Sequence, residues 1–133
     1  MSAEACFAET LLRGLNGFVA RSELEIRSLC RFTVLRELQL VRLYGPHMMM
    51  LAATAGVTAN PDYGLCQRWS RALHLHAEAS DGILYKSNYD NDELVSVLFD
   101  RARDAIDSGS SAPIMSDPRL LGRILNRCRA SIR

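Results

Sequence analysis

Polar side chains that can bind a ligand are gathered in the second half of the chain, beside two apolar runs. The runs are residues 83–85 and 94–99, and the segment between them is rich in Ser, Asn and Asp, which favour turns. This pattern predicts a β-hairpin that supplies a central strand pair. Tyr85, Ser87 and Asn88 would then lie at the open end of the first strand, where a hydroxyl and an amide can contact a ligand without being buried.

A second candidate is Glu9, in a segment whose apolar residues predict a helix over residues 2–15. These residues recur at steps of three and four and share one face: Ala5, Ala8, Leu11, Leu12 and Leu15. Gly14 and the pair Asn16-Gly17 are stop signals for this helix. By pattern alone, Glu9 is a solvated residue paired with Arg13, because charged helix residues are usually solvated.

A third candidate is Trp69, in a helix predicted over residues 63–76. The residues on one side of this helix are Cys66, Trp69 and Leu73. We therefore expect Trp69 to anchor the core first and to offer a platform for a stacked ring second. His74 and His76 point to different sides of a helix, so we expect no metal site there.

Other segments predict elements without chemistry of their own. Residues 33–43 predict one or two strands, which Pro46 ends. A short helix is predicted over residues 47–53, with its methionines filling the core rather than binding a metal. Residues 100–104 predict another short helix, and the composition of residues 107–113 predicts a flexible loop.

The last predicted helix begins at Asp117 and Pro118, a cap residue followed by proline. Its buried stripe is expected to contain Leu120, Leu121, Ile124, Leu125 and Cys128. Arg119, Arg123 and Arg127 recur on another face. Two interpretations of these arginines stay open: a solvated face with cations near the helix C-terminus, or a patch that binds a partner or an anion.

Composition narrows the class of protein. With 133 residues, 48% of them apolar, the chain is expected to form a single domain with one core. A net charge of +1 argues against a bulk nucleic-acid-binding surface. No apolar run approaches the ~20 residues of a membrane helix, and no signal peptide is visible. The four cysteines are widely spaced, as expected of reduced thiols in a cytoplasmic protein.

Several of these segments together resemble RES domains. The sequence DGILYKS at residues 81–87, followed by VLFDRA at 97–102, is similar to the C-terminal signature of that family. Segments 62–63, 67–73 and 7–11 (DY, QRWSRAL and FAETL) also look like the family and occur in its order. The similarity covers most of the chain.

The resemblance implies an α+β fold, an incomplete form of the split mixed β-sheet of ADP-ribosyltransferases with helices around an NAD-binding cleft. On this interpretation residues 1–133 are a single RES-like domain that lacks the family's usual N-terminal segment. Family members are toxins that degrade NAD+ as glycohydrolases or phosphorylases, with NAD+ as substrate and no cofactor required. An antitoxin of Xre type restrains them.

The resemblance also implies roles for single residues. The family is named after an arginine, a glutamate and a serine, of which Glu9 and Ser87 match the last two. The arginine is expected upstream of Glu9, where only eight residues precede it and none fills that place. Glu9 is expected to face the oxocarbenium-like ribose, and Ser87 to hydrogen-bond the nicotinamide or ribose. Tyr85, Asn88 and Trp69 would provide the other contacts with NAD+, so that Glu9 and Ser87 converge on one pocket.

A different class of function is also open. The chain is then an inactive RES-like module that binds an antitoxin or another protein through the face near Arg119 and Arg123. Self-association is expected on either interpretation, because the missing strands would leave apolar surface uncovered.

Overall fold

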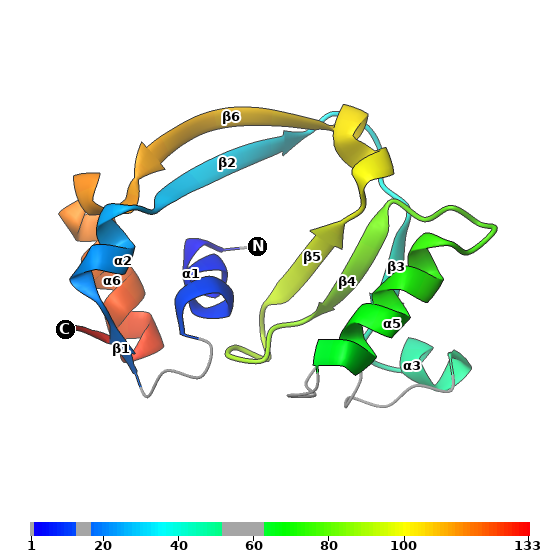
Figure 1. Cartoon of the computed structure of the whole chain (residues 1–133), viewed down its shortest axis with the longest axis horizontal. Coiled ribbons are helices and arrows are strands. Elements are labelled where there is room, and N and C mark those ends of the chain that lie inside the picture. The colour runs from blue at the N-terminus through cyan, green and yellow to red at the C-terminus, as the bar shows by residue number, and fades with distance from the viewer. Residues whose placement is uncertain (1, 13–16, 52–62) are drawn as a thin grey trace. The chain divides into compact units, whose positions relative to one another are not determined.

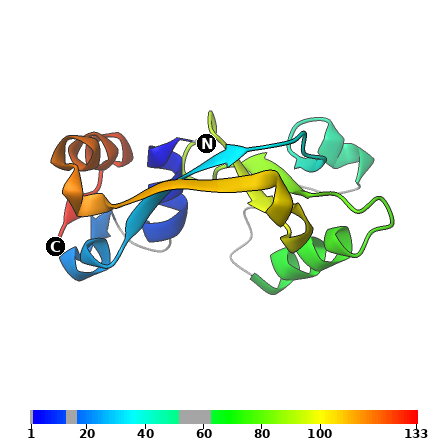
Figure 2. The ribbon, with the colours of Figure 1, turned by 90° about the horizontal axis from the view of Figure 1, so that it is seen from above.

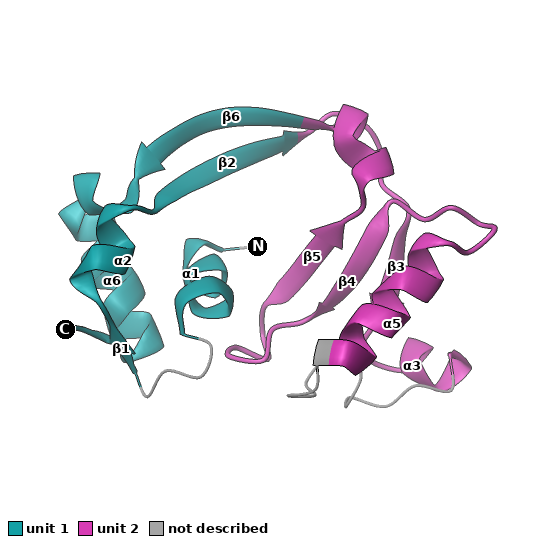
Figure 3. Ribbon diagram, viewed as in Figure 1, with its two compact units in different colours: residues 1–33, 107–133 teal, residues 34–106 magenta. Residues whose placement is uncertain are grey.

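The computed structural model describes residues 2–12, 17–51 and 63–133, which form helices and small β-sheets (Figure 1). This confirms the predicted α+β class. The chain divides into two compact units (Figure 3): residues 1–33 with 107–133 form unit 1, and residues 34–106 form unit 2. Among the described helices, none combines the length and the apolar character that crossing a membrane requires.

Two helices pack together in unit 1. Helix α1 (Ala3–Leu11) begins at Ser2, whose Oγ accepts the N–H of Ala5 at 3.1 Å. It packs against α6 (Pro118–Cys128). Their shared core contains these buried residues: Phe7, Ala8, Leu11, Leu12, Val19, Leu24, Ile114, Leu121 and Ile124. The predicted first helix is confirmed over residues 3–11, and its stop signals before Gly17 lie outside the described residues.

Helix α6 follows its sequence signals closely. The Asp117 carboxylate accepts the N–H groups of Arg119 at 3.1 Å and of Leu120 at 3.0 Å, and Pro118 occupies the first turn. The helix ends at Arg129, which adopts the left-handed conformation with φ +50°. The predicted apolar stripe is confirmed, since its members are either buried or packed against the core of unit 1.

Short strands complete this unit. Strand β1 (Phe18–Val19) pairs in parallel with β7 (Ser131–Ile132). The single-turn helix α2 (Arg21–Glu25) follows β1 and contributes the fully buried Leu24 to the core. A 3-10 turn, η2 (Ile114–Ser116), precedes α6.

Strands β2 (Ser28–Val34) and β6 (Ile106–Pro113) lie side by side as a two-stranded ribbon (Figures 1 and 2). The prediction of a flexible loop over residues 107–113 is therefore wrong. Serine and glycine are poor strand formers, but pairing with β2 satisfies the backbone groups of β6. Gly109 permits close pairing, because a Cβ there would lie 3.0 Å from the carbonyl oxygen of Arg31.

Unit 2 is built on a mixed three-stranded sheet. Strand β4 (Gly82–Lys86) lies in the centre, parallel to β3 (Leu40–Leu43) and antiparallel to β5 (Leu94–Leu98). The predicted central hairpin is confirmed. Helix α5 (Tyr63–His74) places Trp69 and Leu73 against the buried cluster of Leu43, Ile83 and Phe99. A 3-10 helix, η1 (Asp100–Ala105), follows β5 as predicted.

The methionine-rich segment forms the short helix α3 (His47–Met50), as predicted, but its methionines do not fill the core. Met49 is 83% exposed and Met50 is 82% exposed. A helix of one turn presents only one narrow side to the rest of the protein, so most of its side chains stay in solvent. The predicted core role of Met49 and Met50 is wrong.

Candidate functional site

The buried serine at the end of β4 organises the hairpin turn. Ser87 is 1% exposed, and its N–H donates to the carbonyl oxygen of Glu93 at 3.0 Å. Its Oγ accepts the N–H of Tyr89 at 3.1 Å and of Asp90 at 3.3 Å. Two of the three positions that a hydroxyl offers for hydrogen bonds therefore hold the turn in shape. The structure places this serine at the open end of the first strand, as predicted, although it is buried there.

The side chains around Ser87 differ in exposure. Asn88 is exposed in the turn, whereas Tyr85 is half-buried within β4, opposite Val95 of β5. Tyr85 and Trp69 both pack against the buried cluster that contains Phe99, so unit 2 brings these two aromatic residues to one core. The core role of Trp69 is confirmed, and its contact with a ligand stays a prediction.

Glu9 is a buried carboxylate within helix α1. It is 7% exposed and lies in a helix whose other buried residues are Ala5, Phe7, Ala8 and Leu11. The interpretation of Glu9 as a solvated surface residue is therefore wrong, and Arg13 lies outside the described residues. Burial of a carboxylate is costly, so it needs a structural or a functional reason. Glu9 belongs to unit 1 and Ser87 to unit 2, so their convergence stays a prediction.

Sequence patterns missed an ionic cluster in unit 2. Arg36 donates two hydrogen bonds to the Asp81 carboxylate, Nη2 to Oδ1 at 2.9 Å and Nη1 to Oδ2 at 3.0 Å. Arg36 Nη2 also lies 3.2 Å from Asp104 Oδ1. The hydrogen bonds from the Arg36 guanidinium, with that from the Gln39 N–H, lower the pKa of Asp81 to about 2. The same guanidinium lowers the pKa of Asp104.

Asp81 also joins strand ends through its backbone. Its N–H donates to the Gln39 carbonyl at 2.7 Å, and its carbonyl accepts the Phe99 N–H at 2.8 Å. Its Oδ2 accepts the Gln39 N–H at 2.9 Å. Arg36 and Asp81 are separated by 45 residues, so no local spacing could reveal the pair. The cluster fixes the start of β4, whose last residue, Lys86, directly precedes Ser87, and its role here is structural.

A contact between His74 and Asp100 connects α5 to the residues after β5. His74 Nε2 lies 2.9 Å from Asp100 Oδ1, and hydrogen bonding to this imidazole lowers the pKa of Asp100. The His74 ring meets the Phe99 ring edge-on, with centroids 5.0 Å apart. Arg101 donates to the His74 carbonyl oxygen. Within the described ranges, no three His, Cys, Asp or Glu side chains gather in a way that could hold a metal ion.

A cavity of about 410 Å³ opens in unit 1, beside the helix that carries Glu9. Its lining combines apolar side chains, an ion pair and a second arginine: Thr10, Leu11, Phe18, Val19, Ala20, Glu23, Arg27 and Arg133. Glu23 and Arg27 pair at 3.2 Å, and the Arg133 guanidinium lies 4.8 Å from the centre of the Phe18 ring. The lining is therefore mixed, with apolar side chains beside charged groups that already have partners in unit 1.

Comparison with known proteins points to one family. The protein-family model described as RES domain matches residues 1–119 of the chain. This region includes residues of both compact units and every predicted site residue. A protein of Sinorhizobium fredii named "Probable toxin y4kH" is 31% identical over 105 residues, which cover 79% of this chain and 82% of that protein. No solved structure was found to match the chain.

Proposed function

Because the chain belongs to the RES domain family, we propose that it is a RES-type toxin that degrades NAD+. The reaction breaks the glycosidic bond between C1′ of the ribose and the ring nitrogen of nicotinamide, which leaves as a neutral base with the bonding electron pair. An oxygen of water bonds to C1′ and releases one proton to the solvent, or a deprotonated oxygen of phosphate bonds to C1′ directly. The product is ADP-ribose, or its 1-phosphate when phosphate is the acceptor. The relative named as a toxin supports this class of activity.

The observation that carries the proposal is the burial of Glu9, the residue that the resemblance matches to the family glutamate. Positive charge grows on the ribose as the glycosidic bond breaks, and a carboxylate opposite that centre stabilises the transition state. Such stabilisation is stronger where water is excluded. Glu9 is 7% exposed, so its carboxylate is largely removed from water.

The residues of unit 2 have binding roles in this proposal. Ser87 orients the nicotinamide or ribose and shapes the turn through its bonds to Tyr89 and Asp90. Tyr85, Asn88 and Trp69 complete the contacts with NAD+, and no further cofactor is needed. We also propose that the protein acts in the cytoplasm, where an antitoxin of Xre type restrains it.

The proposal is tested by incubating the purified protein with NAD+, with and without phosphate, and measuring released nicotinamide by chromatography. Glu9→Gln keeps the shape of the side chain and removes its charge, so turnover is expected to fall by about 100-fold or more. Glu25→Gln is the matched control, since Glu25 is an exposed helix residue of the same unit. It is expected to stay within about twofold of wild type, as an exposed residue away from special features.

Each outcome has a defined meaning. Equal turnover in wild type and Glu9→Gln would remove the catalytic role of Glu9. Absence of turnover in the wild type at high protein concentration would favour the other function, an inactive RES-like module that binds an antitoxin. The identity of the second product, ADP-ribose or its 1-phosphate, distinguishes water from phosphate as the acceptor.

A further inference from the structure

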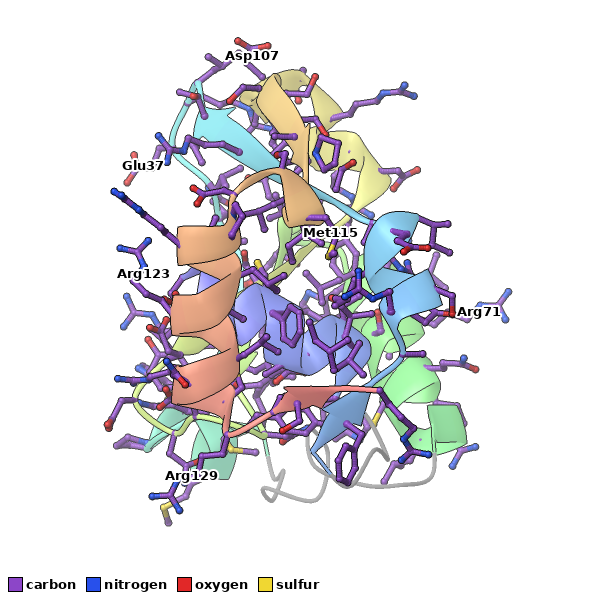
Figure 4. The ribbon with its side chains drawn as sticks, turned by 90° about the vertical axis from the view of Figure 1, so that its left-hand side faces the viewer. Glu37, Arg71, Asp107, Met115, Arg123 and Arg129 are labelled. Carbon is purple, nitrogen blue, oxygen red and sulfur yellow. The ribbon has the colours of Figure 1, made fainter. Side chains whose placement is uncertain are left out.

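The last helix presents a surface of like charge, which we call the arginine surface: Arg119, Arg123, Arg127 and Arg129. All four residues are exposed, and Figure 4 shows Arg123 on the outer side of α6 and Arg129 beyond the end of the helix. The opposite side of α6 is fixed in the core by Leu121, at 6% exposure, and by the fully buried Ile124. The orientation of the arginines is therefore set by packing and does not depend on a partner.

Positive charge is concentrated on this surface, although the whole chain is almost neutral. The whole chain carries 16 basic and 15 acidic residues, whereas the sequence of α6 contains arginines and no acidic residue. The nearest acid in sequence, Asp117, already accepts two backbone N–H groups as the helix cap. In the part of the chain that the structure describes, neither Arg119 nor Arg123 has a carboxylate within ion-pair distance.

Helix stability does not explain this arrangement. Arginines near a helix C-terminus, such as Arg127 and Arg129, are favoured by the helix dipole. Arg119 lies in the first turn, directly after Pro118, where the same dipole disfavours a cation. For the stability of the helix alone, an acidic residue would be the favoured side chain at this position. Arg119 therefore destabilises α6 in the isolated chain, and binding of a negatively charged partner would offset this loss of stability.

We infer that the arginine surface binds an acidic α-helix of a partner protein. Arg119, Arg123 and Arg127 follow one another every four residues, which corresponds to a rise of about 6 Å per step along a helix. A helix with glutamate or aspartate at the same interval has the same repeat, so it can place one carboxylate beside Arg119 and another beside Arg123. Arginine also forms paired hydrogen bonds with carboxylates, which adds orientation to the attraction.

A protein partner fits better than a nucleic acid. Binding to a duplex relies on many phosphate contacts and on a broadly basic domain. This chain is almost neutral overall, and its arginine surface spans one helix of 11 residues. The inference goes beyond the proposed reaction and does not require NAD+ turnover.

The test uses the full chain and a fluorescent peptide of about 20 residues, with glutamate at every fourth position in a helix-forming alanine background. Binding is followed by fluorescence anisotropy at low salt and again at about 300 mM NaCl, where exposed charges are screened. The variant Arg119→Glu/Arg123→Glu is expected to bind about tenfold more weakly than wild type, because two attractive contacts become repulsive. Arg71→Glu, a change at an exposed position of α5, is the matched control and is expected to bind like wild type.

A thermal melt separates binding from folding. Arg119→Glu alone is expected to keep or raise the Tm, because it places an acid in the first turn of α6. Loss of peptide binding without loss of Tm supports the inference. Equal peptide affinity in wild type and the double variant would overturn it. So would tighter binding of a duplex oligonucleotide that the double variant abolishes, since the surface would then serve a nucleic acid.

Discussion

Two buried carboxylates, one in each compact unit, differ in the role that we assign to them. Asp81 and Glu9 are both 7% exposed. Asp81 receives two hydrogen bonds from the Arg36 guanidinium and one from the Gln39 N–H, so its charge is matched by donors that belong to the fold. Glu9 lies on α1, a helix whose other buried residues, Ala5, Phe7, Ala8 and Leu11, are apolar.

Because Asp81 and Glu9 have the same exposed fraction, burial alone does not identify a functional carboxylate. The cluster around Asp81 has a structural purpose, because it fastens the start of β4 to the ends of its neighbours. Glu9 is instead the residue to which the proposed function gives a role in the reaction. Variants that affect stability and activity separately can therefore test the assignment of each residue.

The largest effect on stability is expected next to Asp81, at Gly82. A Cβ added to Gly82 would lie 2.2 Å from the Val97 carbonyl oxygen and 3.0 Å from the Leu98 Cα, so Gly82→Ala forces β4 and β5 apart. We expect a loss in the free energy of unfolding of about 3 kcal/mol or more, the upper range for overpacking. Chemical denaturation measures it. Gly122→Ala is the control: apart from the adjacent residues and the helix's own backbone, no described atom lies within 4 Å of the new Cβ in α6, so a gain of ~0.5–1 kcal/mol is expected. Equal effects at both sites would contradict the close contact at Gly82.

A smaller effect is expected for Asp81→Asn. This change leaves Arg36 without its closest partner, so we expect the Tm at pH 7 to fall by roughly 5 °C. The folded-state pKa of Asp81, about 2, is below its ordinary value of 3.8. The carboxylate therefore stabilises the fold above pH ~4, and this contribution disappears as the pH falls toward about 2.

The difference in Tm between wild type and Asp81→Asn should accordingly narrow between pH 4 and pH 2. Circular dichroism melts over this range provide the measurement. Asp107→Asn, at an exposed position of β6, serves as the control and should show no such convergence. A Tm difference between wild type and Asp81→Asn that stayed constant down to pH 2 would mean that the charge of Asp81 does not stabilise unit 2.

The smallest effect on stability is expected for Glu9→Gln. If Glu9 serves the reaction rather than the fold, its neutral isostere should be as stable as wild type or more stable by ~1 kcal/mol, as is common for functional residues. The same variant is the one expected to lose NAD+ turnover. Denaturant titration at pH 7 checks the stability, and a loss as large as that of Asp81→Asn would place Glu9 among the structural carboxylates.

Local signals predicted the elements whose stabilising contacts lie close together in the chain. The β4–β5 hairpin was visible as two apolar runs around a turn, and Ser87 was placed correctly at its open end. Helix α6 was visible through Asp117, Pro118 and an apolar stripe. Caps, turns and helical periodicity act over a few residues, so they can be read without coordinates.

Other features depend on pairings between distant segments. Strand β6 has the composition of a loop and becomes a strand because β2 lies beside it. Met49 and Met50 are apolar, but the helix that carries them is too short to cover them. The exposure of Glu9 was also predicted wrongly, because helical periodicity does not show what packs against a face.

The sequence by itself determined the family, the α+β class, the hairpin, the capped last helix and the regular spacing of its arginines. The burial of Asp81 and its ion pair depend on tertiary contacts, because Arg36 reaches Asp81 across 45 residues and the exposed Asp104 across 68. The reason is the distance along the chain over which each kind of interaction acts. Backbone propensity and capping act between neighbours in the chain, whereas desolvation and ion pairing depend on neighbours in space.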